Sequence, residues 1–329
     1  MKTLIVSILL FCASIPSFTQ NLTETHYWYD THSKMMQGYY HRGLYPEAIQ
    51  YIDSLKENQY LTPFDYYFFA RLYALSNQFE SSLYYLEKSV KQGISKEQID
   101  VMYDLDKFRE SHLNIVFEIN YTSWHEEYLT SLSNAGKDTV YSHEITALYN
   151  LSREKSRYNI LKIDGDEMYE LKDSLSLYQD EQQTDSTVFV KLTNLITEKG
   201  FPTYKRVGNS FYRATDILRL NYYKNKSLSI LENSWLKIKP LIVKEMKSGN
   251  LKPFYLAHLE DLHRVHQNKP QVYLATKVHS SSPTQNEVSV IAPEALNSRR
   301  KSIGLCSIQI EYWSQAVELP LSLQKIHFK

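Results

Sequence analysis

Apolar residues along most of this chain recur every three or four positions, which is the spacing of helices with one buried face. In the second half of the chain this spacing predicts helices over 143–162, 187–199, 211–222, 227–239, 240–248 and 254–266. Gly200 and Gly249 end two of these helices, and Pro240 suits the first position of a new one. We therefore expect a mainly α fold.

The spacing changes after Pro270, where the residues favour strands. Residues 272–278 and 287–291 are predicted to pair as a small β-hairpin, with turn residues between them. A last helix is predicted to begin at Pro293, because proline is favoured at the first helical position.

The first half of the chain repeats between about residues 30 and 92 with a spacing of 34. The matching positions are Tyr39 with Tyr73, Tyr45 with Phe79, Ala48 with Ser82, Ile49 with Leu83, and Tyr51 with Tyr85. The segments 43–49 and 77–83 each contain a turn followed by the start of a second helix, and both resemble the tetratricopeptide family. The resemblance implies tetratricopeptide-like helical hairpins in a domain over 20–130.

The same resemblance implies that a protein or peptide binds on the concave face of these helices. Tyr39, Tyr73 and Tyr85 are the residues predicted to supply the contacts. The alternative is a spacer that positions the second domain. Two repeats bury little apolar surface, so neighbouring segments are expected to cap them. The segment 104–108 resembles the end that often follows such repeats in exported bacterial proteins, and Phe108 would cover the open side.

A polar stretch over 131–140 precedes a second domain, predicted over 141–329. Its markers are, in chain order, Gly200-Phe201-Pro202, Val207-Gly208, Asp261, Lys269-Pro270-Gln271-Val272-Tyr273, Pro293-Glu294, Arg299-Arg300, Gly304-Leu305 and Glu311-Tyr312. In this order they resemble the domain-of-unknown-function 6624 family. Several polar positions typical of that family differ here, among them Leu262, where the family has an arginine after the aspartate. The resemblance thus implies a fold without implying an activity.

Five polar residues of this domain form the candidate catalytic site: Asp261, Gln271, Tyr273, Arg299 and Arg300. Arginine can hold a carboxylate through two parallel hydrogen bonds, so Asp261 paired with one arginine would be a structural lock. In an enzyme, Asp261 would instead be the acid or base of an uncharacterised reaction, for example a hydrolysis, and an arginine would hold an anion.

The sequence predicts no metal site and no cofactor. His258, His263 and His266 lie close to Asp261, but on a helix they do not all converge, and we interpret them as a solvated helix face. The chain has no Gly-x-Ser-x-Gly elbow, no phosphate-binding glycine-rich loop, no paired-cysteine motif and no His-Glu-x-x-His.

Residues 1–19 are predicted to be a signal peptide, with Lys2 ahead of the apolar run 4–13 and cleavage before Gln20. We expect an exported bacterial protein, periplasmic or extracellular. No transmembrane segment is predicted after the signal peptide. Cleavage would leave Cys306 as the only cysteine, predicted to be a small, partly buried apolar residue.

Charge argues against nucleic acid as a partner, because 37 Lys and Arg balance 37 Asp and Glu. Two hypotheses for the biochemical function follow from the sequence. The first is a non-catalytic protein-binding or scaffolding protein that binds a protein or peptide through the helical repeats. The second is an enzyme centred on Asp261 and Arg299 or Arg300.

Overall fold

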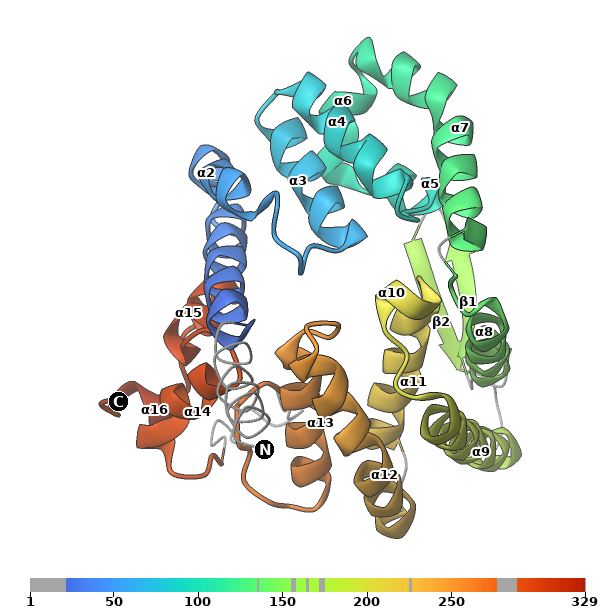
Figure 1. The fold of residues 1–329 in the computed structure, drawn as a ribbon, viewed down its shortest axis with the longest axis vertical. Coiled ribbons are helices and arrows are strands. Elements are labelled where there is room, and N and C mark those ends of the chain that lie inside the picture. The colour runs from blue at the N-terminus through green and yellow to red at the C-terminus, as the bar shows by residue number, and fades with distance from the viewer. Residues whose placement is uncertain are drawn as a thin grey trace, which may run out of the picture. The chain divides into compact units, whose positions relative to one another are not determined.

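The computed structural model describes residues 22–134, 136–154, 158–163, 166–171, 175–224, 227–276 and 289–328. Most of these residues are helical, as the apolar spacing predicts (Figure 1). The predicted signal peptide, residues 1–19, lies outside the described residues. Within the described ranges, no helix combines the length and the apolar character needed to cross a membrane.

The chain divides into two compact units. The first takes the residues up to 135 together with 252–254 and the residues from 272 onward, and the second takes 136–251 and 255–271. This division differs from the predicted one, in which 141–329 formed one domain. The C-terminal segment belongs with the N-terminal helices because long-range hydrogen bonds hold it there. In one of them the backbone N–H of Cys306 donates to Asp30 Oδ2 at 2.8 Å.

The first unit begins with a helix over 22–40. The N-terminal elements that follow are α2 (Tyr45–Leu55), α3 (Pro63–Leu75), α4 (Phe79–Val90), α5 (Lys96–Asp100), the 3-10 turn η1 (Tyr103–Leu105), α6 (Asp106–Arg109) and α7 (Leu113–Asn134). The C-terminal segment adds the 3-10 turn η2 (Pro293–Ala295), α14 (Leu296–Ser302), α15 (Ile308–Ser314) and α16 (Leu321–Gln324). Helix α3 packs along α4, and α4 packs along α7 (Figure 1).

The backbone of these helices repeats at the interval seen in the sequence. Helices α2, α4 and α7 start at Tyr45, Phe79 and Leu113, so that the same interval separates each start from the next. The turn before α2 contains Gly43 with a φ of 72°, and the turn before α4 contains Asn77 with a φ of 56° at the equivalent place. Glycine and asparagine adopt this left-handed conformation most easily, which explains these two residue types.

Side chains in the interior repeat with the backbone. Ala48 on α2 and Ser82 on α4 occupy equivalent places in successive repeats and are both fully buried, and their small size lets a neighbouring helix approach closely. Ile52 and Leu86 are a second equivalent pair and are also fully buried. The apolar interior of this part of the first unit is therefore built twice from the same pattern.

A third copy of the pattern ends in α7, and its first helix is broken into α5, η1 and α6. Helix α3 begins at a capping box between Thr62 and Asp65, and α5 begins at a capping box between Ser95 and Gln98. Phe108 of α6 is 1% exposed and packs against other aromatic rings of the interior. Phe108 therefore belongs to the apolar interior of the first unit, and its role as a cap of the repeats stays a prediction.

The second unit contains α8 (Thr139–Glu154), β1 (Tyr158–Ile163), β2 (Asp166–Leu171), α9 (Leu175–Lys199), α10 (Tyr204–Val207), α11 (Ser210–Lys224), α12 (Leu228–Lys247) and, from residue 255, α13 (Pro253–His266). Helix α9 packs against α8, α11 and α12. Fully buried apolar side chains of its core include Tyr141, Ile145, Phe189, Leu192, Ile196, Ala214, Leu218 and Ile242. Gly200 follows α9 directly with a φ of 87°, as expected of a residue that ends a helix.

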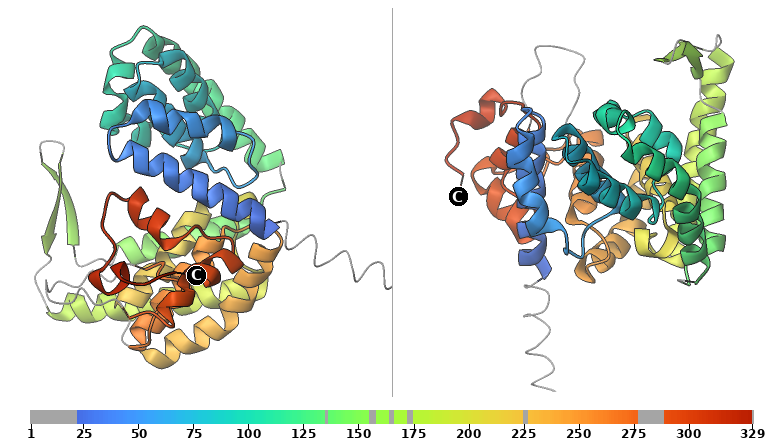
Figure 2. Two further views of the ribbon diagram at one scale, coloured as in Figure 1. Left: turned by 90° about the vertical axis from the view of Figure 1, so that its left-hand side faces the viewer. Right: turned by 90° about the horizontal axis from the view of Figure 1, so that it is seen from above.

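Strands β1 and β2 form an antiparallel pair in which Ile163 lies opposite Asp166 (Figure 2). The predicted helix over 143–162 is therefore too long, because α8 ends at Glu154 and a strand follows. The helix predicted to start at residue 187 instead starts at Leu175.

The hairpin predicted over 272–278 and 287–291 is not found in the described residues of that segment. Gln271 and Val290 are isolated bridge residues, and no strand extends through 272–276. Leu274 has a φ of 52°, which is incompatible with a continuous strand. The part over 277–288 lies outside the described residues.

Pro240 lies inside α12 rather than at the start of a new helix. A proline within a helix removes one backbone hydrogen bond and disfavours a straight continuation. The buried residues Trp235, Ile238 and Ile242 lie on both sides of it in sequence, and their packing in the core keeps the two halves in one helix.

Candidate functional site

Arg300, predicted to hold either Asp261 or a bound anion, is only 1% exposed. Its Nε donates to the carbonyl of Cys306 at 2.7 Å, and its Nη1 donates to the carbonyl of Tyr273 at 2.8 Å. Its Nη2 forms an ion pair with Glu311 at 3.2 Å. These partners leave the guanidinium no free edge for a substrate, so Arg300 is a structural anchor.

Arg299 likewise donates all its hydrogen bonds in the described residues to backbone carbonyls. Its Nε donates to Val272 at 3.0 Å, its Nη1 donates to Ala292 at 3.0 Å, and its Nη2 donates to Ile291. These bonds tie α14 to the residues on either side of the segment 277–288. Arg299 and Arg300 together fix the path of the chain rather than hold an anion.

The remaining three predicted site residues are divided between the units. Asp261 and Gln271 belong to the second unit and are 0% and 1% exposed, whereas Tyr273 belongs to the first unit and is half-buried. A carboxyl group with no exposed surface is badly placed to exchange protons with a substrate. The pairing of Asp261 with an arginine stays a prediction.

Glu311 lies at the centre of a buried network of charges that local sequence patterns do not reveal. Lys34 Nζ lies 3.1 Å from one carboxylate oxygen, Arg300 Nη2 lies 3.2 Å from the other, and Gln315 Nε2 donates to the carboxylate at 2.7 Å. Burial alone would raise the pKa of Glu311, but Lys34 and Arg300 outweigh it and hold the pKa below its usual range. We call Asp30, Lys34, Arg300 and Glu311 the Glu311 network.

Two members of the Glu311 network lie close to Cys306, so that three metal-ligand types come together. Single ligand atoms of Asp30, Cys306 and Glu311 all lie within 4.8 Å of one another. Two cations, Lys34 and Arg300, already pair with Glu311, and the field of Asp30 also acts on Lys34, so a metal ion here would lie beside two positive charges. Burial also raises the pKa of the Cys306 thiol well above its ordinary value, which opposes the thiolate form that binds metals. The set therefore fits a structural lock better than a metal site.

The tyrosines predicted to contact a partner are packed between helices. Tyr73 and Tyr85 stack with ring centroids 5.6 Å apart, and Tyr85 is only 6% exposed. Tyr39 is half-buried and stacks on Tyr51 at 5.9 Å. Tyr85 thus contributes to the core of the hairpins. The exposed tyrosine next to it is Tyr84, at 50%.

A cluster of arginine and aromatic residues, missed in the sequence, joins all three copies of the repeat. It comprises Tyr40, Phe68, Arg71, Tyr103 and Asp104, and we call it the Arg71 cluster. Arg71 Nε donates to Asp104 Oδ2 at 2.8 Å, and Arg71 Nη2 donates to the Tyr40 hydroxyl at 2.7 Å. The Tyr40 hydroxyl in turn donates to Asp104 Oδ2 at 2.7 Å. Asp104 lies in the segment that resembles the end of tetratricopeptide repeats, and this resemblance was the available signal.

The histidine group near Asp261 is not wholly a solvated helix face. His263 is 8% exposed and stacks on Trp235 with ring centroids 5.7 Å apart. The edge of Tyr222 also meets it, at 5.9 Å. Burial lowers the pKa of His263, which favours the neutral ring. The prediction was wrong for this residue because aromatic side chains from other helices cover it.

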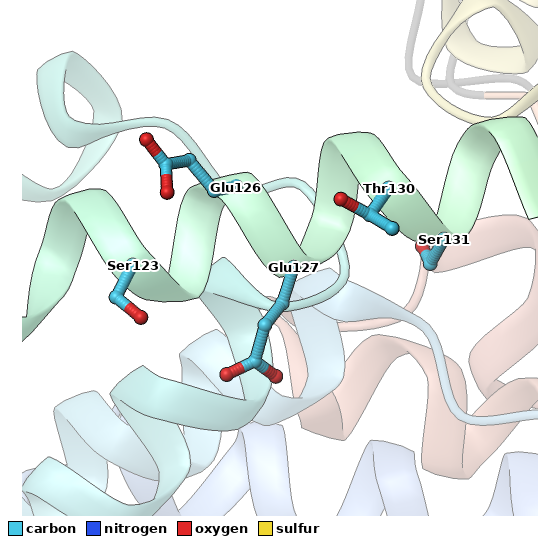
Figure 3. A pocket seen from close by; sticks show the side chains of 5 residues that line it. All are labelled: Ser123, Glu126, Glu127, Thr130 and Ser131. Carbon is cyan, nitrogen blue, oxygen red and sulfur yellow. The ribbon is translucent and has the colours of Figure 1, made fainter.

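One face of α7 carries an open hollow of polar side chains (Figure 3). Ser123, Glu126, Glu127, Thr130 and Ser131 line it, all within one helix. Lys91 already pairs with Glu127 at 3.0 Å. A hollow formed by one helix surface lacks the enclosing walls of a ligand pocket, and we assign no binding role to it.

Comparison of the chain with protein-family models, with curated proteins and with solved structures gives no match.

Proposed function

We propose that this protein is an exported scaffold that binds a protein or peptide through tetratricopeptide-like helical hairpins in its first unit. The observation that carries the proposal is the geometric repeat, with helix starts at Tyr45, Phe79 and Leu113. The period between these starts is that of tetratricopeptide helix pairs, and such repeats commonly present a binding surface.

The number of repeats supports this interpretation. About three stacked pairs are needed before such an array buries enough apolar surface to be stable. Two complete pairs and the broken third pair, α5 to α7, supply that number. The fully buried small residues Ala48 and Ser82 at equivalent positions support close stacking of the same type.

The alternative, an enzyme centred on Asp261 and Arg299 or Arg300, has less support. Both arginines donate hydrogen bonds to backbone carbonyls, and Arg300 also forms an ion pair with Glu311. The resemblance of the C-terminal half to the domain-of-unknown-function 6624 family remains part of the proposal, as a fold without an assigned reaction. Export to the periplasm or the exterior of a bacterium also remains a proposal, supported by the pattern of residues 1–19.

Affinity capture with matched surface variants tests the binding function. Tyr103, in the first unit, is 70% exposed, and Leu236, in the second, is 67% exposed, so alanine at either position should leave the fold intact. Immobilised wild-type protein and the L236A variant should capture the same partner from an extract of the native cells. The Y103A variant should capture it less. Equal capture by all three folded proteins would argue against a binding surface on the repeats.

A further inference from the structure

Two buried polar atoms of the second unit have no hydrogen-bond partner, although the rings that carry them are in contact. The Tyr222 hydroxyl and His263 Nδ1 bond to none of the residues that the structure describes. Tyr222 of α11 is 4% exposed and His263 of α13 is 8% exposed, and the edge of one ring meets the other at 5.9 Å between centroids. Unpaired buried polar groups destabilise a fold, so two of them side by side point to a further bonded group.

Both unpaired atoms carry a hydrogen that they can donate. Gln267 Nε2 lies 3.1 Å from His263 Nε2, and because an amide nitrogen only donates, the ring nitrogen is the acceptor. Burial lowers the pKa of His263, which keeps the ring neutral, and its single N–H is therefore on Nδ1. Burial raises the pKa of the Tyr222 hydroxyl, which keeps its proton as well.

Aromatic rings from two further helices border these donors. His263 stacks on Trp235 of α12 with centroids 5.7 Å apart, and Phe189 of α9 meets the Tyr222 ring at 6.2 Å. Trp235 is buried and Phe189 has no exposed surface. We call these four side chains the Tyr222–His263 site. Apolar and aromatic walls with a few polar groups are the usual composition of a site for a small molecule.

The charges around His263 favour neither sign. Burial has the largest effect on its pKa, and beyond burial two carboxylates raise the pKa and two ammonium groups lower it, namely Glu260, Glu232, Lys269 and Lys239. An ion brought into a buried site needs a partner of opposite charge. Equal numbers of both signs around His263 therefore suit a neutral molecule better than an ion.

An ion pair at the surface covers one wall of the Tyr222–His263 site. Lys239 Nζ lies 2.6 Å from a Glu260 carboxylate oxygen and 5.5 Å from the centroid of the Trp235 ring. The Lys239 side chain is 45% exposed, and an ion pair with such an exposed partner contributes little to stability. Displacement of this long side chain gives a small molecule access to Trp235.

We propose that the Tyr222–His263 site binds a small neutral molecule through an acceptor oxygen, as carboxamides and ketones offer. The oxygen accepts from His263 Nδ1–H and from the Tyr222 hydroxyl, since a carbonyl oxygen has two lone pairs. The rings of Trp235 and Phe189 contact the apolar part of the molecule. The site lies in the second unit, so this inference is independent of the binding function proposed for the helical repeats.

Titration with acetamide, acetone and acetate tests the inference, because the three probes have nearly the same shape. Acetamide and acetone offer a neutral carbonyl oxygen, whereas acetate carries a charge. The full mature chain is labelled with nitrogen-15 in its histidines, and NMR follows the ring signals of His263, which are assigned by their loss in H263N. The proteins compared are wild type, Y222F and, as a matched control, Y149F, which removes the hydroxyl of a partly buried tyrosine of α8 in the same unit. Circular dichroism and urea unfolding establish that each is folded.

Acetamide and acetone should shift the His263 signals of wild type and Y149F saturably, and acetate should bind about tenfold more weakly or not at all. Y222F loses only the unpaired hydroxyl, so it should fold and bind acetamide about three- to tenfold more weakly, the effect of one hydrogen bond. Three results would each overturn the site: no saturable shift in folded wild type, equal affinity for acetate and acetamide, or equal affinity of Y222F and wild type for acetamide.

Discussion

Tyr73 and Tyr85 stack with their ring planes only 6° apart. They occupy the positions equivalent to Tyr39 and Tyr51, which also stack, in the preceding repeat. The stack of Tyr73 on Tyr85 joins α3 to α4, and the stack of Tyr39 on Tyr51 joins the helix over 22–40 to α2. Two contacts between the same residue types at the same places in successive hairpins indicate that the repeat exists in packing as well as in sequence.

Truncation of a stacked tyrosine should therefore cost folding stability. We expect Y85A to lower the free energy of unfolding by about 3–5 kcal/mol, because removal of the buried ring creates a cavity and abolishes the stacking contact with Tyr73. The neighbouring Y84A variant removes a side chain that is 50% exposed and should change the free energy of unfolding by less than about 1 kcal/mol. Urea titration followed by circular dichroism measures both. Similar small losses for the two variants would show that the stack is not part of the core.

The Glu311 network should respond strongly to removal of its central charge. E311Q leaves Lys34 and Arg300 buried without their carboxylate, and we expect a loss of about 3–5 kcal/mol in the free energy of unfolding. E294Q, on an exposed side chain of the same segment, is the control and should be nearly neutral. A stable E311Q variant would contradict the structural role given to the network.

The pH dependence of this effect has a defined sign. The pKa of Glu311 is lower in the folded state than its ordinary value of 4.5. The unfolded chain therefore takes up a proton first, so the stabilisation is present above pH 4.5 and is lost as the pH falls through the folded pKa. Unfolding midpoints of wild type and E311Q should converge below pH 4.5. A constant difference down to low pH would mean that Glu311 is not held as a carboxylate.

His26 should control stability at a higher pH. Burial lowers the pKa of His26 from 6.5 to about 4. Its Nδ1 lies 2.7 Å from the carbonyl oxygen of Gly304, to which the N–H of the neutral ring can donate. The unfolded chain binds the proton more readily, so stability is lost as the pH falls from 6.5 to about 4, by about 3 kcal/mol from this group. Urea midpoints at pH 7.5, 6.0 and 5.0 should show this slope in wild type.

The control for His26 is H26N, whose amide can also donate to Gly304 but does not titrate. The slope between pH 7.5 and 5.0 should be smaller in H26N than in wild type. Identical slopes would assign the acid sensitivity of the protein to other groups.

Gly38 and Trp313 give a test of how the C-terminal segment docks within the first unit. A methyl group added at Gly38 would lie 2.0 Å from Cζ3 of Trp313, and Arg42 stacks on the same indole at 4.2 Å. G38A should therefore destabilise the unit by about 1–3 kcal/mol. In the double variant G38A/W313A the overlap is absent, so the two losses should be less than additive. Additive losses would show that α15 does not pack against Gly38.

Much of the helical framework could be predicted from the sequence because helices leave a local pattern. The turns at Gly43 and Asn77, the small buried residues Ala48 and Ser82, and the helix end at Gly200 all follow from local chemistry. The third repeat escaped notice because its first helix is broken, and its amphipathic spacing is interrupted at η1.

The strand pair β1–β2, the position of Pro240 and the Glu311 network were not predicted from the sequence. The Asp-Gly dipeptide at 164–165 is a hairpin signal in the sequence, whereas we predicted a helix over 143–162 directly before it. Pro240 lies inside α12 because the packing of its neighbours in the core outweighs the preference of proline for the start of a helix. The Glu311 network unites Lys34 with residues far along the chain, and no local pattern encodes such a pairing.

Site-specific photo-crosslinking in the native cells tests the central claim most directly. A benzophenone amino acid replaces Tyr103 in one protein and Leu236 in another, two positions of nearly equal exposure in different units. The account predicts a discrete crosslinked partner from position 103 that is absent from position 236. Crosslinking from position 236 alone, or from neither position in the folded protein, would contradict a binding function of the helical repeats.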